Sequence, residues 1–580
     1  MPTEAQRARA PRSSNHLAPA GGPRPQWRAL LDFAALPVAI AAVAAFIVVF
    51  DNDALWRGVL EQTRLDDHRG AIVVTIFVLV LCTISVLLAL VPGKRPLRAA
   101  GGVLLVVAAI CGYFMAEYGV IIDASMIRNI AETKPQEASP LLTMSLLVHV
   151  AAFGVAPALA LWFVPLPRDG WRRGLAQRAV TIAVSVAVLG GTLYANYGAV
   201  AYFGRQYHEV RLLINPTYPL YSLARFWLRE SDHAPRVRQP LDARVADAHR
   251  RGAKPTLLVM VVGETARADR WSFNGYERDT NRYTRPRGVV SFGSVTSCGT
   301  STADSVPCLF SDLGHADFTH PAAASRENLF GLLDRLGVGV FWRDNSTGCK
   351  EVCDPMHFEE FAERTDEGLC DSTGCFDEVL LRNIDSLVAD TGRDHLIVLH
   401  QRGSHGPAYH TDVPAANKEF LPECDLPSLR NCNRDLINNA YDNTILYTDF
   451  FLSRVIDFLE GRKSDYQVAL LYVSDHGESL GENGLYLHGL PYAIAPHEQT
   501  RVPMLFWASP DLYQSAGVTE DCVRAGAGRD LSHDWIFHTV LPLFGVESSA
   551  YNEQLDVLAS CRGALLTHLP APAARRDAPL

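Results

Sequence analysis

The stretch TLLVMVVGET at residues 256–265 decides the fold of the C-terminal part of the chain. An unbroken apolar run follows Thr256 and ends at Gly263-Glu264-Thr265. Such a run, bounded by polar residues, indicates a strand buried on both faces, as in parallel sheets covered by helices. Ligands bind beyond the carboxyl ends of the strands in these sheets. Glu264 is therefore the first candidate for a functional residue.

Four later apolar runs are similar to this one, and helical patterns lie between them. The runs are 337–342, 395–400, 467–473 and 502–507, and the helical patterns include 327–336, 376–390 and 438–460. Buried strands that alternate with helices predict a largely parallel sheet with helices on both faces, a three-layer α/β domain. The length of 580 residues also exceeds the roughly 100–200 residues of one domain.

Carboxylates and imidazoles follow three of the predicted strands. The first strand ends at Glu264, the third runs into HQRGSHGP at 400–407, and the fourth runs into SDHGE at 474–478. Two carboxylates and an imidazole that meet at one edge of a sheet would suit a zinc or manganese ion. A single strand-end residue is more often a solvated loop side chain, so the prediction depends on the three strand ends together.

The segment SCGTSTADSVPC at 297–308 places small hydroxyl residues between two cysteines. This composition indicates a tight loop, held by a disulfide, that leads into a helix. A helix N-terminus attracts anions, and a hydroxyl that touches a metal there could attack phosphorus. Composition alone leaves Thr300, Ser301, Thr302 and Ser305 as candidates, and an ordinary N-cap is the alternative role.

Five apolar runs in the N-terminal part predict a membrane domain. They are 29–50, 71–91, 99–122, 141–164 and 179–203, and each approaches or exceeds the ~20 residues needed to cross ~30 Å of hydrocarbon. The flanking segments 1–28, 92–98 and 165–178 hold twelve Lys and Arg, whereas 51–70 and 123–140 hold five. Positive segments stay inside, so the N-terminus is cytoplasmic and the residues after the fifth span are outside.

The cysteines provide an independent test of this orientation. Two of the twelve, Cys82 and Cys111, lie in predicted spans, and the other ten lie in the C-terminal domain. An even, dense set in an exported domain predicts disulfides, and neighbour pairing is the simplest connectivity, although sequence alone does not fix it. A cytosolic zinc–cysteine cluster is disfavoured because no paired C-x-x-C spacing occurs.

These observations divide the chain into five parts. We expect a disordered cytoplasmic tail at 1–28, a five-span transmembrane domain at 29–205, a juxtamembrane helix and linker at 206–254, a periplasmic catalytic domain at 255–565 and a flexible tail at 566–580. The net charge of −10 says little, because the two halves of the chain differ sharply in composition. A nucleic-acid partner is disfavoured because the C-terminal domain shows no basic patch or binding fingerprint.

The chain resembles the phosphoethanolamine transferases of Gram-negative bacteria, which include the lipid A transferases and the mobile colistin-resistance enzymes. The resemblance rests on VVGETARADRWSFNGYERDTN, SCGTSTADSVPC, LHQRGSHGP and SDHGESLGENGLYLHGLPYAIAPHEQTRVP, and it covers nearly the whole chain after the N-terminal tail. It implies an alkaline phosphatase/sulfatase-like α/β domain after five membrane helices, in the bacterial inner membrane.

The resemblance also implies roles for individual residues. Thr302 would be the nucleophile, and one firm zinc site would consist of Glu264, Thr302, Asp475 and His476. His405 and His488 match histidines that contact the phosphoryl group or a second zinc ion, and their acid–base roles stay open. The head group would meet Thr300, Lys350 and Glu478, and the donor lipid would meet Asn129, Thr133 and Glu137. The family's disulfides fit Cys298–Cys308, Cys349–Cys353, Cys370–Cys375, Cys424–Cys432 and Cys522–Cys561.

The implied reaction is zinc-dependent transfer of phosphoethanolamine from phosphatidylethanolamine to lipid A through a phosphothreonine, giving polymyxin resistance by a monomeric enzyme. Core sugars, Kdo and periplasmic glucans stay open as acceptors. A sulfatase is disfavoured because C-x-P-x-R is absent. A phosphoglycerol transferase of the lipoteichoic acid type is the nearest rival enzyme, and a degenerate scaffold or lipid sensor is the non-enzymatic alternative.

Overall fold

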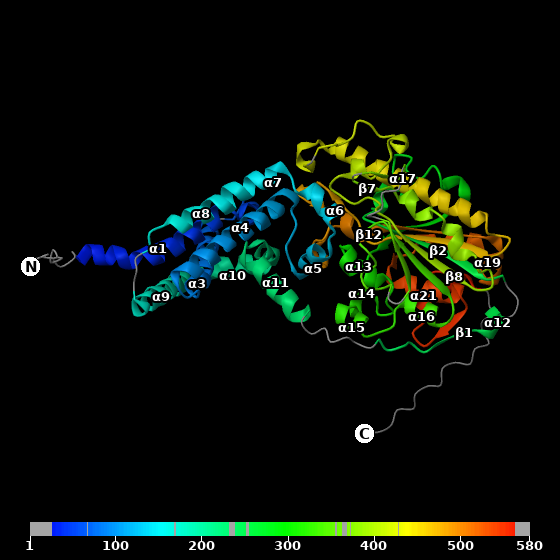
Figure 1. The fold of residues 1–580 in the computed structure, drawn as a ribbon, viewed down its shortest axis with the longest axis horizontal. Coiled ribbons are helices and arrows are strands. Elements are labelled where there is room, and N and C mark those ends of the chain that lie inside the picture. The colour runs from blue at the N-terminus through cyan, green and yellow to red at the C-terminus, as the bar shows by residue number, and fades with distance from the viewer. Residues whose placement is uncertain are drawn as a thin grey trace, which may run out of the picture.

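The structure is a computed structural model that describes residues 26–66, 68–166, 170–230, 238–250, 254–353, 356–361, 368–371, 373–426 and 428–562. Figure 1 shows a helical domain at the N-terminal side and an α/β domain at the C-terminal side. The predicted tails fall outside the described residues, except that helix α1 (Gln26–Phe50) already begins within the first of them.

Five helical stretches of the first domain are long and apolar enough to cross a membrane: Asp32–Phe50, Arg69–Ala89, Lys94–Tyr118, Met144–Phe163 and Trp171–Ala195. The five predicted spans are thus present. The fifth span differs from the expected range 179–203. Helix α9 (Trp171–Ala195) begins and ends earlier, and a separate helix, α10 (Tyr197–Gln206), follows. The Asn196 side chain donates to the Thr192 carbonyl (3.0 Å), a local bond that competes with continuation of the helix.

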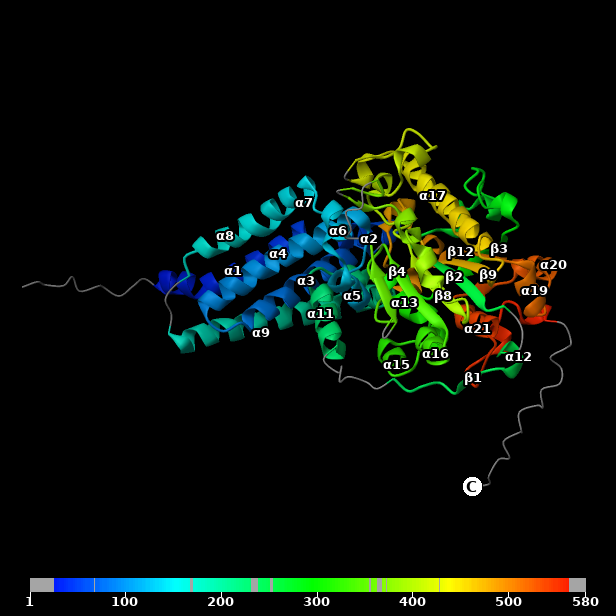
Figure 2. The ribbon, with the colours of Figure 1, turned by 45° about the vertical axis from the view of Figure 1, so that its right-hand side comes forward.

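Short helices connect the two domains. Between the third and fourth membrane helices lie α5 (Ala124–Glu132) and α6 (Pro135–Ala138), and α11 (Thr217–Glu230) follows the last one. Both views place α5 and α11 at the junction of the helical and α/β domains (Figure 1, Figure 2). The junction is therefore built from the expected external loop, which contains α5, and from the expected juxtamembrane helix, which corresponds to α11.

The α/β domain contains an eight-stranded sheet in the order β13-β3-β12-β9-β2-β8-β4-β5. Its central strands are β9 (Gln467–Ser474), β2 (Thr256–Gly263), β8 (His395–His400) and β4 (Gly339–Asp344), all parallel. The sheet is mixed, because β12 (Arg501–Ala508) runs antiparallel to β9 and to β3 (Val290–Thr296). The loop from β9 to β12 stays at one edge, so β12 must run back.

Both faces of strand β2 are buried, as its apolar run predicts. Leu258, Met260 and Val262 belong to one core, and alternate residues such as Val259 belong to another on the opposite face. The long helix α17 (Arg434–Glu460) covers one face, and α16 (Leu329–Arg335) and α21 (Asp534–Leu543) cover the other (Figure 1). The predicted three-layer arrangement is confirmed.

The helix predicted at 376–390 is wrong. Two 3-10 helices, Asp377–Leu381 and Ile384–Val388, occupy this segment. Asn383 between them has a φ of 53°, in the left-handed region that ends a helix. The carbonyls of Leu380 and Arg382 accept from the Arg343 guanidinium at 2.8 and 2.7 Å. These carbonyls bind a side chain of strand β4 and not the next helical turn.

The ten cysteines of the α/β domain form the five predicted neighbour pairs, Cys298–Cys308, Cys349–Cys353, Cys370–Cys375, Cys424–Cys432 and Cys522–Cys561. Cys82 and Cys111 are free, as expected for cysteines within membrane helices. The first disulfide lies beside the candidate nucleophile and holds the loop that precedes helix α13 (Thr302–Leu309).

Candidate metal and nucleophile site

Four adjacent strands bring the candidate ligands to one edge of the sheet. In the register of the sheet, Val262 is level with His400 and Val473, and Asp344 is also level with His400. Glu264 comes directly after β2, His400 is the last residue of β8, and Asp475 comes directly after β9. Residues from distant parts of the sequence therefore meet because parallel strands end together.

Thr302, Glu264, Asp475 and His476 form one buried cluster. The Thr302 Oγ1 atom lies 3.1 Å from Glu264 Oε2 and 3.3 Å from His476 Nε2. The same His476 nitrogen lies 3.4 Å from Glu264 Oε1 and 3.4 Å from Asp475 Oδ2. The structure thus brings together all four residues of the expected zinc site.

Glu264 and Asp475 of this cluster, together with His400, form a group that could hold a cation. One ligand atom from each of Glu264, His400 and Asp475 lies within 4.8 Å of the others. Among the described residues, the buried atoms His400 Nε2 and Asp475 Oδ2 have no hydrogen-bond partner. Buried polar atoms normally have a hydrogen-bond partner. Carboxylate oxygens and imidazole nitrogens that lack one, and that lie close together, are the atoms that typically bind a metal ion.

The electrostatics of the two carboxylates agree with this reading. Burial raises the pKa of Asp475, and the neighbouring Glu264 carboxylate raises it further. Burial would also raise the pKa of Glu264, but the imidazoles of His400, His476 and His405 outweigh it and hold the pKa below its usual range. Two buried carboxylates side by side repel each other, and a divalent cation would relieve that repulsion.

His400 is a site residue that the family resemblance did not include. Its Nδ1 atom lies 2.7 Å from Asp344 Oδ1, and its Nε2 atom lies 3.8 Å from Glu264 Oε2. Burial lowers the pKa of His400, but the two carboxylates outweigh it and raise that pKa to about 10. Its place at the end of a buried strand was a sufficient signal. Asp344 is likewise the last residue of strand β4, two residues beyond the apolar run expected at 337–342.

The nucleophile loop is fixed from several sides. The Thr300 hydroxyl donates to the Leu490 carbonyl (2.6 Å), and the Ser305 hydroxyl donates to the Asp475 carbonyl. His533, which the sequence did not single out, accepts from the Cys298 amide (3.1 Å) through Nδ1 and contacts the Ser474 carbonyl (2.9 Å) through Nε2. Burial lowers the pKa of His533 to about 3, so the ring is neutral and links the loop to the end of strand β9 through these two contacts.

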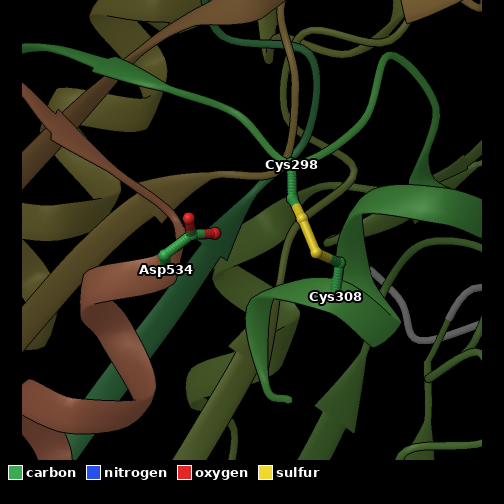
Figure 3. Close-up of side chains that lie close together, drawn as sticks. All are labelled: Cys298, Cys308 and Asp534. Carbon is green, nitrogen blue, oxygen red and sulfur yellow. A yellow bond between two sulfur atoms is a disulfide. The ribbon is translucent and has the colours of Figure 1, made fainter. Parts of the chain in front are cut away.

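A second group of metal-type residues, Cys298, Cys308 and Asp534, lies behind the same loop. Figure 3 shows that the two cysteines are joined in a disulfide, with the Asp534 carboxylate to one side. Metal binding by cysteine requires a free thiolate, so these sulfur atoms are not ligands. Asp534 instead accepts a hydrogen bond from the His315 amide (2.8 Å).

His405 and His488 lie next to the cluster. The ring centroids of His476 and His488 are 4.5 Å apart, and those of His405 and His488 are 5.2 Å apart. His488 Nδ1 lies 2.8 Å from Glu478 Oε2, and the other Glu478 oxygen accepts from the Tyr409 hydroxyl (2.7 Å). Glu478 therefore orients His488. Burial lowers the pKa of His488, which favours its neutral form.

A cavity of about 420 Å³ connects this site to the helical domain. At one end it is lined by Thr302, His405, His488 and the loop residues Thr347 and Lys350. At the other end it is lined by apolar residues of α4 (Lys94–Tyr118), α5 and α11, including Ile110, Phe114, Ile127, Ile130, Leu220 and Leu223. The cavity is thus polar at the nucleophile and apolar towards the membrane helices.

The remaining predicted residues lie in different places around this cavity. Asn129 and Thr133 line it from α5 and the residue after α5, and Lys350 lines it from the α/β domain. Lys350 Nζ lies 3.3 Å from Glu132 Oε2, an ion pair between the two domains. Glu137 belongs to α6, but its side chain lies outside the described part of the structure.

Comparisons with known proteins agree with this arrangement. Residues 79–230 match the family model "Phosphoethanolamine transferase EptA/EptB", and residues 256–546 match the sulfatase model. Phosphoethanolamine transferase EptA of Salmonella typhimurium is 36% identical over 89% of this chain and 95% of its own length. Phosphatidylethanolamine transferase Mcr-1 of Escherichia coli is 36% identical over 89% and 96%.

A solved structure extends the likeness to both domains. The integral membrane lipooligosaccharide phosphoethanolamine transferase A of Neisseria meningitidis superposes with a TM-score of 0.87 at 33% identity, covering 90% of this chain and 98% of that one. The similarity therefore includes the membrane helices, the sheet and their relative placement.

Proposed function

Because the chain belongs to the phosphoethanolamine transferase family, we propose that it transfers phosphoethanolamine from phosphatidylethanolamine to a phosphate group of lipid A. The protein is a multi-pass membrane enzyme whose C-terminal domain lies in the periplasm. The observation that carries the proposal is the cavity between the nucleophile and the membrane helices. The polar head group of a phospholipid matches the end of the cavity at the nucleophile, and its acyl chains match the apolar end.

The donor fits the cavity by chemistry. Acyl chains would lie against the apolar residues of α4, α5 and α11, and burial of that surface would contribute roughly 25 cal/mol per Å². The phosphate would then lie near Thr302 and Lys350, which line the other end. Asn129 and Thr133, on the wall between these ends, are placed to meet the glycerol and phosphate region.

Thr302 is the proposed nucleophile. Its hydroxyl donates to Glu264 Oε2 (3.1 Å), so a carboxylate is in place to take the proton as the oxygen attacks phosphorus. The Thr302 Oγ–phosphorus bond forms while the bond from phosphorus to the glycerol oxygen breaks. The leaving oxygen gains a proton, for which His405, or His488 once it is protonated, is the donor at this end of the cavity. Diacylglycerol then departs.

The second step reverses the roles of the oxygens. An acceptor oxygen attacks phosphorus, the bond from phosphorus to Thr302 breaks, and the Thr302 oxygen takes back the proton that Glu264 accepted in the first step. A lipid A phosphate is already ionised at neutral pH, so it needs no general base. A masked phosphate carries less negative charge, which would weaken binding of cationic peptides such as polymyxin.

Zinc is the proposed metal at Glu264, Asp475 and His476 with the Thr302 oxygen, and His400 lies beside them. Imidazole and carboxylate ligands suit this ion, which when bound would make the Thr302 hydroxyl more acidic and offset phosphoryl charge.

Mass spectrometry of lipid A tests the proposal. Expression in a Gram-negative host that lacks such transferases should add the mass of phosphoethanolamine to lipid A and raise the polymyxin concentration needed for killing. The Thr302→Ala variant serves as the control and should leave lipid A unchanged. Unmodified lipid A together with a modified core sugar or glucan would reassign the acceptor.

A further inference from the structure

One external segment of the membrane domain contacts three separate parts of the catalytic site. The Ser125 hydroxyl of α5 donates to Asp304 on α13, the helix that begins at the nucleophile. The Met126 methyl group packs on Gly489, next to His488, where an added Cβ would lie within 2.7 Å of it. Lys134, just after α5, reaches the loop that follows strand β4. The site is therefore built against the membrane domain.

Lys134 makes the contact closest to the metal ligands. Its ammonium group donates to the Ser346 carbonyl (3.1 Å), pairs with Glu360 and lies 3.7 Å from Asp344 Oδ2. The Lys134 side chain is 22% exposed and that of Asp344 is 0% exposed. A cation that comes from another domain thus faces a fully buried carboxylate.

Asp344 and Ser346 in turn contact the metal-site residues. Asp344 Oδ1 lies 2.7 Å from His400 Nδ1, and His400 Nε2 lies 3.8 Å from Glu264 Oε2. The Ser346 hydroxyl lies 3.4 Å from the same Glu264 oxygen. Two of the residues near this carboxylate, His400 and Ser346, are therefore linked to Lys134. The link to His400 runs through the charge of Asp344, and the link to Ser346 runs through the Ser346 carbonyl.

We propose that Lys134 is a positioning residue of the active site, through which the docked membrane domain sets the geometry of Glu264 for metal binding; this rests on the metal-dependent function proposed above. Partners that orient metal ligands typically matter by 10–100-fold in affinity or activity. Lys134 acts one contact further out, so an effect near the lower limit, about tenfold, is expected.

Zinc affinity of the full-length protein tests this role. The metal-free protein in detergent is titrated with zinc in competition with a fluorescent chelator. We expect Lys134→Met to raise the zinc dissociation constant by about tenfold, and Lys134→Arg, which keeps the cation, to retain most of the affinity. The KM for phosphatidylethanolamine should not change, because Lys134 is not among the residues that line the donor cavity.

Arg430→Met is the matched control. Arg430 also joins the two domains, because its guanidinium donates to the Glu117 carbonyl of α4 as well as to the Gly484 carbonyl of its own domain. It contacts none of the metal-site residues in the described structure. It should leave zinc affinity unchanged. Equal zinc affinity of Lys134→Met and wild type, or an equal loss in Arg430→Met, would overturn the proposal.

The outcome is separable from that of the proposed function. A protein that modifies lipid A but shows no Lys134 effect contradicts only the positioning role. A protein that binds zinc in a Lys134-dependent way but leaves lipid A unmodified contradicts only the acceptor. A wild-type protein that binds no zinc contradicts both.

Discussion

Four hydroxyl side chains lie close together around the start of α13, and each has a different environment. Thr300 and Ser305 donate to backbone carbonyls, which uses their protons within the fold. Ser301 is buried, and its oxygen has no hydrogen-bond partner among the described residues. Thr302 alone of these four is bonded to Glu264 and to His476. Only this hydroxyl is placed both to lose its proton to a carboxylate and to meet a metal.

We therefore expect Thr302→Ala to lower transfer by about 10⁴-fold or more, as loss of a nucleophile does in other enzymes. Intact-mass analysis should show a phosphoethanolamine adduct on the wild type and none on the variant. Ser301→Ala, which removes the neighbouring hydroxyl without removing a bond, should keep both adduct and activity. An adduct that maps to Thr300 would contradict the assignment.

The ends of the buried strands allow much of the site to be predicted from the sequence. Glu264, Asp475 and His476 directly follow strands with clear apolar runs, so their meeting follows from the sheet. His533 could not be found in this way, because its role depends on a contact with the Cys298 amide that leaves no local sequence pattern. Asp344, which contacts His400, ends strand β4 and follows the same rule, but the expected apolar run stopped at residue 342.

Among the secondary-structure elements, the loop between β9 and β12 carries an unusual share of the site. Asp475, His476, Glu478 and His488 all belong to it, and the loop returns to the sheet as an antiparallel strand. Periodicity identified strand β12 but not its direction. Direction depends on whether a connection crosses the sheet, and this loop does not cross it.

The helix prediction at 376–390 failed because contacts with distant residues, which periodicity does not reveal, decide this segment. Its apolar residues recur at helical spacing, but Asp377 accepts from the Arg402 amide (2.8 Å) and the Gly403 amide (3.1 Å). Tertiary contacts of this kind override local propensity. Elements with long, strongly apolar patterns, such as β2 and the five membrane helices, were predictable because burial dominates their energetics.

Two of the disulfides should have different effects when removed. Cys298–Cys308 closes ten residues beside Thr302, whereas Cys522–Cys561 closes 39 residues. By chain entropy, each should contribute about 3–4 kcal/mol to stability, the larger loop more. Replacing both cysteines of the first pair by serine should lower kcat as well as Tm, because the nucleophile loop loses its restraint.

The second pair is the matched control for that experiment. Its double serine variant should lower Tm at least as much while the folded protein keeps its kcat. Activity per folded molecule, with the folded fraction measured by thermal unfolding, separates the two effects. Equal kcat in both variants would show that the loop is held without the Cys298–Cys308 bond.

At the scale of the whole molecule, the two domains share one cavity and one interface. Residues of α4, α5 and α11 form the apolar end of the cavity, and the catalytic loops form the polar end. The same α5 segment supplies Ser125, Met126 and the approach to Lys134. The proposed donor site and the geometry of the metal site therefore depend on one docked arrangement of the domains.

A bulky side chain at the apolar end of the cavity should slow the reaction with a lipid substrate but not with a soluble substrate. Leu220 lines the cavity from α11, and a bulkier side chain there would displace an acyl chain. We expect Leu220→Trp to raise KM for phosphatidylethanolamine in vesicles by about tenfold, equivalent to about 1.4 kcal/mol. Turnover of a small soluble phosphoethanolamine ester should stay close to that of the wild type.

Leu228→Trp is the control, because Leu228 lies on the same helix, is 76% exposed and does not line the cavity. It should leave both substrates unaffected. If Leu220→Trp slowed both reactions equally, the cavity would not be the donor site.

The apolar end of the cavity also bears on selective inhibition. An inhibitor with a lipid-like tail and a head group that avoids the metal ligands would draw its affinity from the walls of α4, α5 and α11. Each 100 Å² of apolar surface it buried would contribute about 2.5 kcal/mol. Selectivity would then come from the membrane domain, and the compound would not act as a general chelator.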